Sequence, residues 1–126
     1  MKKLTLLLLL MVSPNVFAEW TRVISSKDGK NTFYINFETI KRKDNKVKMW
    51  ELVDFKTVEQ GSLSSLNRNE YDCEEETTRT LDLYYYSGNM KNGEIVISQS
   101  NIKEEPSSIR PDTIESVFYK IACNKK

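Results

Sequence analysis

"DNKVKMWELVDFK", residues 44–56, has the strongest strand pattern in the chain. Alternate residues of a strand point to opposite faces of a sheet. One set consists of Val47, Met49, Glu51, Val53 and Phe55, and the other consists of Lys48, Trp50, Leu52 and Asp54. Because both sets contain apolar residues, we expect a central strand that is covered on one face and partly covered on the other.

Two shorter strands are predicted before this segment. "EWTRVISS" (19–26) alternates, and "NTFYINF" (31–37) places Phe33, Ile35 and Phe37 on one face. Asp28-Gly29 lies between them and is a strong hairpin signal. "ETIKRK" (38–43) is too short for a helix, so we expect a turn there.

The segments that follow the central strand alternate between turn and strand signals. "TVEQGSLSSLN" (57–67) is polar, contains a glycine and is expected to be a loop. Residues 68–88 are predicted to form two strands or one long bent strand, and "EIVISQS" (94–100) a further strand after the turn at 89–93. "EEPSSIRP" (104–111) is expected to lack regular structure.

A helical period begins after Pro111. Asp112 or Thr113 is the expected N-cap, with Glu115 three residues after Asp112. The helix should end just before Cys123, and its apolar stripe consists of Ile114, Val117, Phe118 and Ile121. The order of elements predicts an α+β fold in which an antiparallel sheet of five or six strands packs against one C-terminal helix.

The N-terminus is typical of a bacterial secretory signal. Lys2 and Lys3 precede an apolar run that is too short to span a bilayer, and cleavage is expected between Ala18 and Glu19. We therefore predict a signal peptide over residues 1–18 and one domain over 19–126, with no transmembrane anchor. A lipid anchor would need a cysteine where Glu19 stands. The periplasm is the expected location, with secretion or the cell surface as the alternative.

The chain has two cysteines, Cys73 and Cys123. In an oxidising compartment two cysteines of a small domain are expected to form one disulfide. A redox pair would need a C-x-x-C motif, and a zinc site would need more ligands than two thiols in a chain without histidine. The acidic residues around Cys73 are expected to be solvated strand residues.

Charge and composition argue against nucleic-acid binding and against catalysis. Removing Lys2 and Lys3 from the 19 basic residues leaves 17 against 18 acidic residues, a balance unlike that of a nucleic-acid binder. The commonest general base is missing because there is no histidine. "SNIK" (100–103) matches S-x-x-K without its companion motifs, and Glu104-Glu105 lies beside a proline loop. We expect no enzyme, no metal site and no cofactor.

Two surface features remain as candidates for binding. "KRKDNKVK" (41–48) is either a patch that contacts acidic glycans, matrix proteins or lipid headgroups, or a charged hairpin that stays soluble and discourages edge pairing. "LYYYSGNM" (83–90) has tyrosines that either anchor an interface or lie under the helix. The predicted binding surface consists of Lys41, Arg42, Lys43, Lys46, Lys48, Trp50, Tyr84 and Tyr86.

Several segments together resemble the bacterial surface-adhesin protein E family. They are "EWTRV", "FYINFETIKRKDNKVKMWELVDFK", "EYDCEEETTRTLDLYYYSG", "GEIVIS" and "VFYKIAC", in the order of the family. The resemblance implies an antiparallel sheet with a C-terminal helix, a Cys73–Cys123 pair and dimer formation. It also implies binding of host matrix and serum proteins such as laminin and vitronectin.

The expected function is therefore that of an exported, non-catalytic binding protein with a protein partner. The alternative is a periplasmic accessory or inhibitor protein that binds a component of the bacterial envelope. The chain departs from a surface adhesin in one respect, because it has no lipid-anchor cysteine after the predicted cleavage position.

Overall fold

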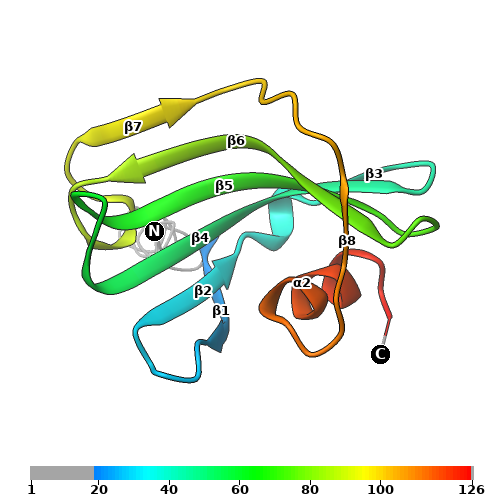
Figure 1. Cartoon of the computed structure of the whole chain (residues 1–126), viewed down its shortest axis with the longest axis horizontal. Coiled ribbons are helices and arrows are strands. Elements are labelled where there is room, and N and C mark those ends of the chain that lie inside the picture. The colour runs from blue at the N-terminus through cyan, green and yellow to red at the C-terminus, as the bar shows by residue number, and fades with distance from the viewer. Residues whose placement is uncertain (1–18, 126) are drawn as a thin grey trace, which may run out of the picture.

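Eight antiparallel strands and one C-terminal helix make up the computed structural model, which describes residues 19–125 (Figure 1). The predicted signal peptide, with Ala18, lies outside these residues. The strands are β1 (Thr21–Ser25), β2 (Asn31–Ile35), β3 (Lys41–Lys43), β4 (Lys46–Glu59), β5 (Ser62–Asp72), β6 (Thr77–Tyr86), β7 (Ile95–Gln99) and β8 (Ser107–Ser108). The helices are α2 (Ile114–Ala122) and two short 3-10 turns, η2 (Phe37–Thr39) and η3 (Asn89–Lys91).

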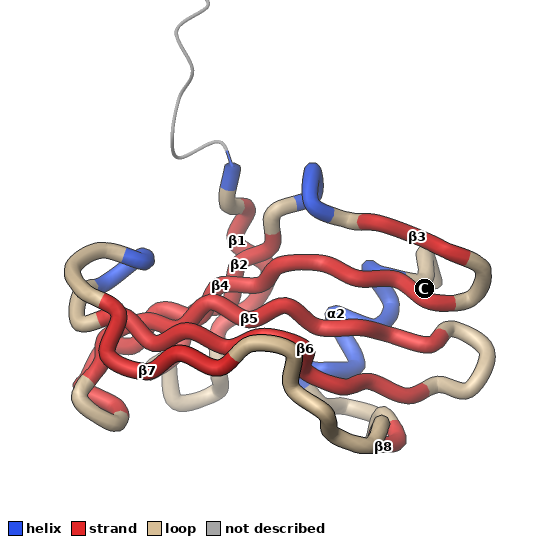
Figure 2. The backbone as a smooth tube through the Cα atoms, turned by 90° about the horizontal axis from the view of Figure 1, so that it is seen from above, coloured by secondary structure: helices blue, strands red, loops and turns tan. Residues whose placement is uncertain are grey.

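The main order of the sheet is β1-β2-β4-β5-β6-β7, with β3 paired to β4 and β8 paired to β6. Figure 2 shows that α2 lies behind the strands in that view, so the helix covers one face of the sheet. The predicted fold, an antiparallel sheet with one C-terminal helix and one disulfide, is confirmed. Within residues 19–125 no helix is long and apolar enough to cross a membrane.

Strand β4 is the centre of the sheet, as its sequence predicts. It pairs with β2 and β3 on one side and with β5 on the other. Val47 and Met49 are fully buried on the face that α2 covers. Leu52 belongs to the opposite set of residues and is also fully buried, which agrees with a second face that is partly covered.

The predicted first hairpin joins β1 to β2, and Gly29 in its turn has a φ of +73°, a conformation that favours glycine. Phe33 and Ile35 pack in the core. Phe37 was expected on the same face, but it lies in η2 and is 50% exposed. The segment expected to be only a turn, 38–43, continues from η2 into strand β3.

The prediction of a loop over residues 57–67 is wrong, because β4 continues to Glu59 and β5 starts at Ser62. Buried serines make this polar segment suitable for a sheet. The Ser64 hydroxyl donates to the carbonyl of Gly88 (2.6 Å) and accepts from the amide of Lys91 (2.9 Å). A hydroxyl that is satisfied in this way can be buried without a large cost.

Residues 68–88 form two strands, β5 and β6, and 94–100 contain β7, as expected. The segment 104–111 was expected to lack regular structure. Instead, Ser107 and Ser108 pair with Thr78 and Thr77 of β6 as the short strand β8.

Helix α2 starts where the sequence predicts, but its buried face is rotated. Thr113 is the N-cap, and it forms a reciprocal capping box with Ser116 rather than one between Asp112 and Glu115. The buried positions are Ser116, Phe118, Tyr119 and Ala122, whereas Ile114, Val117 and Ile121 are half-buried. Tyr119 takes its place in the core because its hydroxyl donates to the carbonyl of Cys73 (3.2 Å).

The disulfide Cys73–Cys123 joins the β5–β6 turn to the C-cap of α2, as predicted. Of the acidic neighbours of Cys73, only Asp72 is a partly exposed strand residue, which corrects the expectation. Glu74 to Glu76 lie in the exposed turn. Glu70 lies in β5, is only 7% exposed and accepts from Arg79 Nε at 2.9 Å.

Candidate ligand-binding surface

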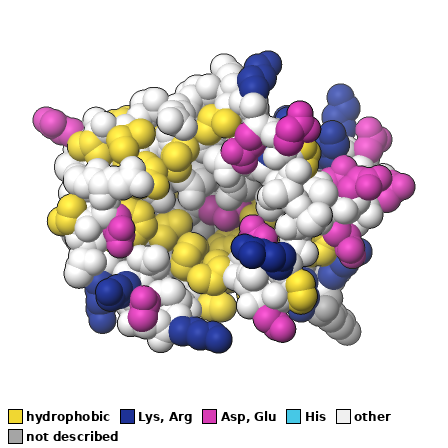
Figure 3. All heavy atoms as spheres, viewed as in Figure 1, with side chains coloured by type: hydrophobic (Ala, Val, Ile, Leu, Met, Phe, Trp, Pro, Cys, Tyr) yellow, Lys and Arg dark blue, Asp and Glu magenta, His cyan; other side chains and the backbone are white. Residues whose placement is uncertain are grey.

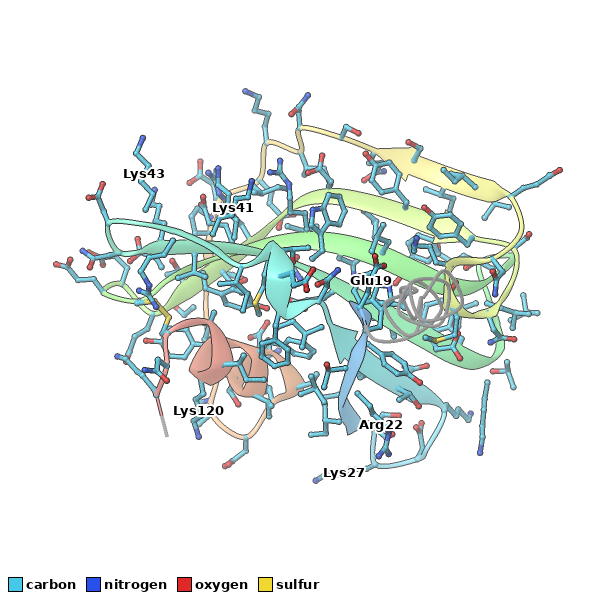
Figure 4. The ribbon with its side chains drawn as sticks, turned by 180° about the vertical axis from the view of Figure 1, so that it is seen from behind. Glu19, Arg22, Lys27, Lys41, Lys43 and Lys120 are labelled. Atoms are coloured by element: carbon cyan, nitrogen blue, oxygen red, sulfur yellow. A yellow bond between two sulfur atoms is a disulfide. The ribbon has the colours of Figure 1, made fainter. Side chains whose placement is uncertain are left out.

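The hairpin between β3 and β4 places four lysines on one face of the sheet. Its two-residue turn, Asp44-Asn45, sets Lys41 opposite Lys48 and Lys43 opposite Lys46. Residues that are directly opposite in an antiparallel pair share a face. Figure 4 shows Lys41 and Lys43 pointing away from α2. We call Lys41, Lys43, Lys46 and Lys48 the lysine ladder.

Arg42, a fifth member of the predicted binding surface, points to the other face. It is opposite the buried Val47. Its Nη2 donates to the carbonyl of Ala122 at 3.0 Å, and its Nη1 lies 3.9 Å from Cys73 Sγ. A cation at the last carbonyls of a helix is favourable because of the helix dipole. Arg42 therefore supports the end of α2 and does not belong to the lysine ladder.

Replacement of Arg42 by glutamine tests this structural role. We expect the free energy of unfolding to fall by about 1 kcal/mol, because one hydrogen bond to a helix carbonyl and a favourable dipole interaction are lost. Urea unfolding of the two proteins measures the difference. Equal midpoints would show that the contact between Arg42 and Ala122 contributes nothing to stability.

A groove of about 730 Å³ runs between the lysine ladder and the end of β5. Arg42 and the turn residues Asp44 and Asn45 also line it, and its other wall consists of Arg68, Glu70, Asp72, Glu74 and Glu75. A smaller hollow of about 290 Å³ is lined by three of the same cations, Lys41, Lys48 and Arg68, and it reaches Trp50. The two hollows therefore share one basic edge.

The groove has one basic wall and one acidic wall. Figure 3 shows acidic and basic side chains gathered at the right-hand end of the molecule, where Figure 1 places the β3–β4 hairpin and the β5–β6 turn. Glu70 pairs with Arg79 and lies 4.0 Å from Lys48. Within residues 19–125, Lys41, Lys43 and Lys46 form no ion pair closer than 4 Å.

Trp50 and Tyr84 stack beside the lysine ladder on the same face. Their ring centroids are 6.2 Å apart with an interplanar angle of 21°. The guanidinium of Arg68 lies 5.9 Å from the Trp50 ring and is also held by Asp82 (2.5 Å). The sequence analysis did not identify Arg68 as part of this surface. Arg68 reaches the Trp50 ring because the pairing of β4 with β5 places it directly opposite Trp50.

The three consecutive tyrosines, residues 84–86, divide between the two faces of the sheet. The register sets Tyr84 opposite Leu66 and Tyr86 opposite Ser64, so Tyr86 lies on the same face, farther from the ladder. Tyr85 points to the other face and packs near Phe55, with ring centroids 6.3 Å apart. Tyr84 and Tyr86 therefore do not lie under α2.

Glu51 is a buried acid on the face that α2 covers, and it was not recognised as special in the sequence. Its side chain accepts a hydrogen bond from the Tyr71 hydroxyl at 2.5 Å, and Glu51 is 6% exposed. Burial raises the pKa of the carboxyl group to about 7. Asn67 is directly opposite in β5, and its buried Oδ1 has no hydrogen-bond partner.

The candidate catalytic residues lie in the irregular segment that follows β7. Ser100 follows β7, and its hydroxyl hydrogen-bonds to that of Tyr84 (2.7 Å). Lys103 lies beyond it in an irregular segment, so the two side chains are not on one turn of a helix. Glu104 accepts from the amide of Thr80 at 2.8 Å.

Comparison with known proteins agrees with this fold. The family model described as surface-adhesin protein E matches residues 20–124. No curated protein sequence matches the chain.

The chain is also similar to solved structures of Haemophilus influenzae protein E. One is 16% identical, with a TM-score of 0.66, and the match covers 90% of this chain and 91% of that chain. Crystal form II is 16% identical, with a TM-score of 0.65 and coverage of 89% and 92%. A protein E structure from non-typeable H. influenzae is 15% identical, with a TM-score of 0.60 and coverage of 89% and 80%. At these identities the similarity shows a shared fold.

Proposed function

Because the chain belongs to the surface-adhesin protein E family, we propose that it is an exported, non-catalytic binding protein whose partner is another protein. The family model spans residues 20–124, nearly the whole predicted mature domain. The family is one of adhesins, which favours a role in binding over a role in catalysis. Host matrix proteins are the partners that we propose first. A homodimer, tested by light scattering, is part of the same proposal.

The proposed binding site is the lysine ladder with the neighbouring Trp50 and Tyr84. One observation carries this choice: three of the four lysines have no acidic partner within 4 Å in the described part of the chain, and they line a groove. Cations that are not neutralised within the protein are free to attract an oppositely charged partner. The stacked aromatic pair adds a rigid wall of the kind that is enriched at interfaces.

A charge reversal tests the site. The variant Lys41→Glu/Lys43→Glu should bind immobilised laminin or vitronectin at least about 10-fold more weakly, because two attractive charges become repulsive. Biolayer interferometry measures the affinities. Lys27→Glu/Lys120→Glu is the matched control, and its affinity should be unchanged because both lysines point away from the ladder in Figure 4. Wild-type affinity in the double variant would remove the lysine ladder from the binding site.

The cellular location decides between a host partner and a bacterial one. Protease treatment of intact cells should digest the protein if it is at the surface, and culture medium should contain it if it is secreted. Protection on intact cells, followed by release on osmotic shock, would confine the protein to the periplasm. That result would contradict adhesion to a host and would favour the alternative, an accessory protein that binds an envelope component.

A further inference from the structure

We propose that the lysine ladder binds a sulfated polysaccharide, so that the partner is recognised through a polyanionic glycan. This inference rests on the proposed binding function and names the chemistry of its ligand. It starts from the register of the β3–β4 hairpin, in which Lys41 is opposite Lys48 and Lys43 is opposite Lys46.

The four lysines of the ladder repel one another within the hairpin. Like charges directly opposite each other on a sheet destabilise it, so two such pairs in succession oppose the folding of the hairpin. Lysines on an edge strand discourage pairing with other chains, which explains Lys41 and Lys43 of β3. Lys46 and Lys48 lie on β4, where β5 places Asp72 opposite Lys46 and Glu70 opposite Lys48. These two acids offset part of the repulsion within the ladder. Even so, Lys41, Lys43 and Lys46 form no ion pair within 4 Å in the described residues, so their ammonium groups remain available to an anion.

The density of charge favours a polysaccharide over an acidic peptide. The ladder presents two ammonium groups in each row, and its rows are about 6.7 Å apart, the length of two strand residues. An extended peptide presents one side chain to a given face over the same length, so it would leave half of the ladder unpaired. A sulfated polysaccharide carries several sulfate groups on each disaccharide and can meet both lysines of a row.

The type of free cation also favours sulfate. Arginine presents a planar fork that suits a carboxylate, whereas lysine is a point charge that does not depend on the orientation of the anion. Both arginines near the groove are already engaged: Arg42 with Ala122 at 3.0 Å and Arg68 with Asp82 at 2.5 Å. The cations left for a ligand are lysines.

The acidic wall of the groove limits where the polyanion can lie. Glu74 and Glu75 are exposed on the β5–β6 turn across from the ladder. They repel a sulfated chain and confine it to the β3–β4 side. Neutralising these two acids should therefore strengthen binding. Non-specific attraction by all the surface cations would not depend on these two acids in particular.

Salt dependence of binding to immobilised heparin tests the proposal. If four ammonium groups displace counterions from heparin, the affinity of the wild-type protein should fall about 100-fold between 50 and 200 mM NaCl. The same release of counterions makes protein–DNA binding depend on salt. Lys43→Gln/Lys46→Gln should halve the logarithmic slope and weaken binding at least about 10-fold at 150 mM. Glu74→Gln/Glu75→Gln should tighten it several-fold.

The matched control removes the same charge elsewhere. Lys27 and Lys120 point away from the ladder in Figure 4, so Lys27→Gln/Lys120→Gln should keep the wild-type slope. The melting temperature of Lys43→Gln/Lys46→Gln should change little, because removal of the repulsion between the two lysines offsets the lost attraction between Lys46 and Asp72. An unchanged melting temperature excludes misfolding as the cause of weak binding. Neutral dextran should not compete with heparin.

Three results would overturn the proposal. One is the same heparin affinity in the ladder variant and in the control. Another is binding to phosphatidylglycerol vesicles without binding to heparin, which would indicate a membrane ligand. The third is laminin binding that neither heparin competition nor heparinase treatment reduces; this would leave the proposed binding function intact while refuting its glycan ligand. Absence of binding to any matrix protein or to heparin would refute both.

Discussion

Loss of the Cys73–Cys123 disulfide is expected to lower the melting temperature by about 15 °C. The bond closes a loop with a sequence separation of 50 residues, and such a loop restricts the unfolded chain by about 4 kcal/mol in the chain-entropy model. Each kcal/mol corresponds to roughly 4 °C or more in a domain of about 100 residues. The bond also fixes the end of α2 beside the carbonyl of Cys73 that accepts from Tyr119.

Differential scanning calorimetry of three variants measures this effect. Cys73→Ser, Cys123→Ser and the double variant should melt at nearly the same temperature, because each removes the same bond. A reducing agent should bring the wild-type protein down to that temperature and should leave the double variant unchanged. If the double variant has the same melting temperature as the oxidised wild-type protein, the disulfide does not stabilise the fold.

The elements that were predicted correctly are those with strong local signals. The Asp28-Gly29 turn fixes the first hairpin, alternation over residues 44–56 identifies the central strand, and the period after Pro111 identifies α2. The cysteine pair follows from the compartment that the N-terminus predicts. Each of these inferences depends on residues that are close in sequence or on chemistry that does not depend on the fold.

The incorrect predictions involve tertiary contacts. The serines of residues 62–65 look like a loop because their hydroxyls are polar, and only Gly88 and Lys91, some 25 residues later, satisfy Ser64 in the sheet. The rotation of α2 depends on the carbonyl of Cys73, which the helical period does not reveal.

The lysine ladder could have been found in the sequence, at least in part. A two-residue turn at Asp44-Asn45 sets the register of the hairpin, and the register places each residue on one face or the other. The turn alone therefore predicts that Arg42 lies on the opposite face of the sheet from Lys41 and Lys43. The place of Arg68 could not be found in this way, because it depends on the pairing of β4 with β5.

Because of Glu51, we expect the protein to be more stable in mild acid than in mild base. The carboxyl group is buried at the middle of the sheet, and its hydrogen-bond partners, Tyr71 and Asn69, are uncharged. Burial without a cationic partner disfavours the charged form, which raises the pKa of Glu51 from 4.5 to about 7. Protonation would also give Glu51 a donor beside the Oδ1 of Asn67, which otherwise lacks a partner.

The sign follows from proton binding. Between pH 4.5 and pH 7 the folded protein holds a proton on Glu51 that the unfolded chain releases, so the free energy of unfolding decreases as the pH rises. The decrease ends above pH 7, where both states are ionised, and it amounts to about 3 kcal/mol at most. The chain has no histidine, the side chain that ordinarily titrates in this range.

Glu51→Gln should abolish this dependence, because the amide keeps the shape of the protonated acid and cannot ionise. Urea unfolding at pH 5 and pH 8 should show a variant that is close to the wild type in acid and more stable than it by about 2–3 kcal/mol in base. Glu75→Gln, an exposed acid in the β5–β6 turn, is the control and should retain the wild-type pH dependence. Parallel profiles for wild type and Glu51→Gln would mean that Glu51 ionises at its ordinary pKa in the folded protein. The buried carboxyl would then be stabilised by its contacts with Tyr71 and Asn69, and its charge would not oppose the fold.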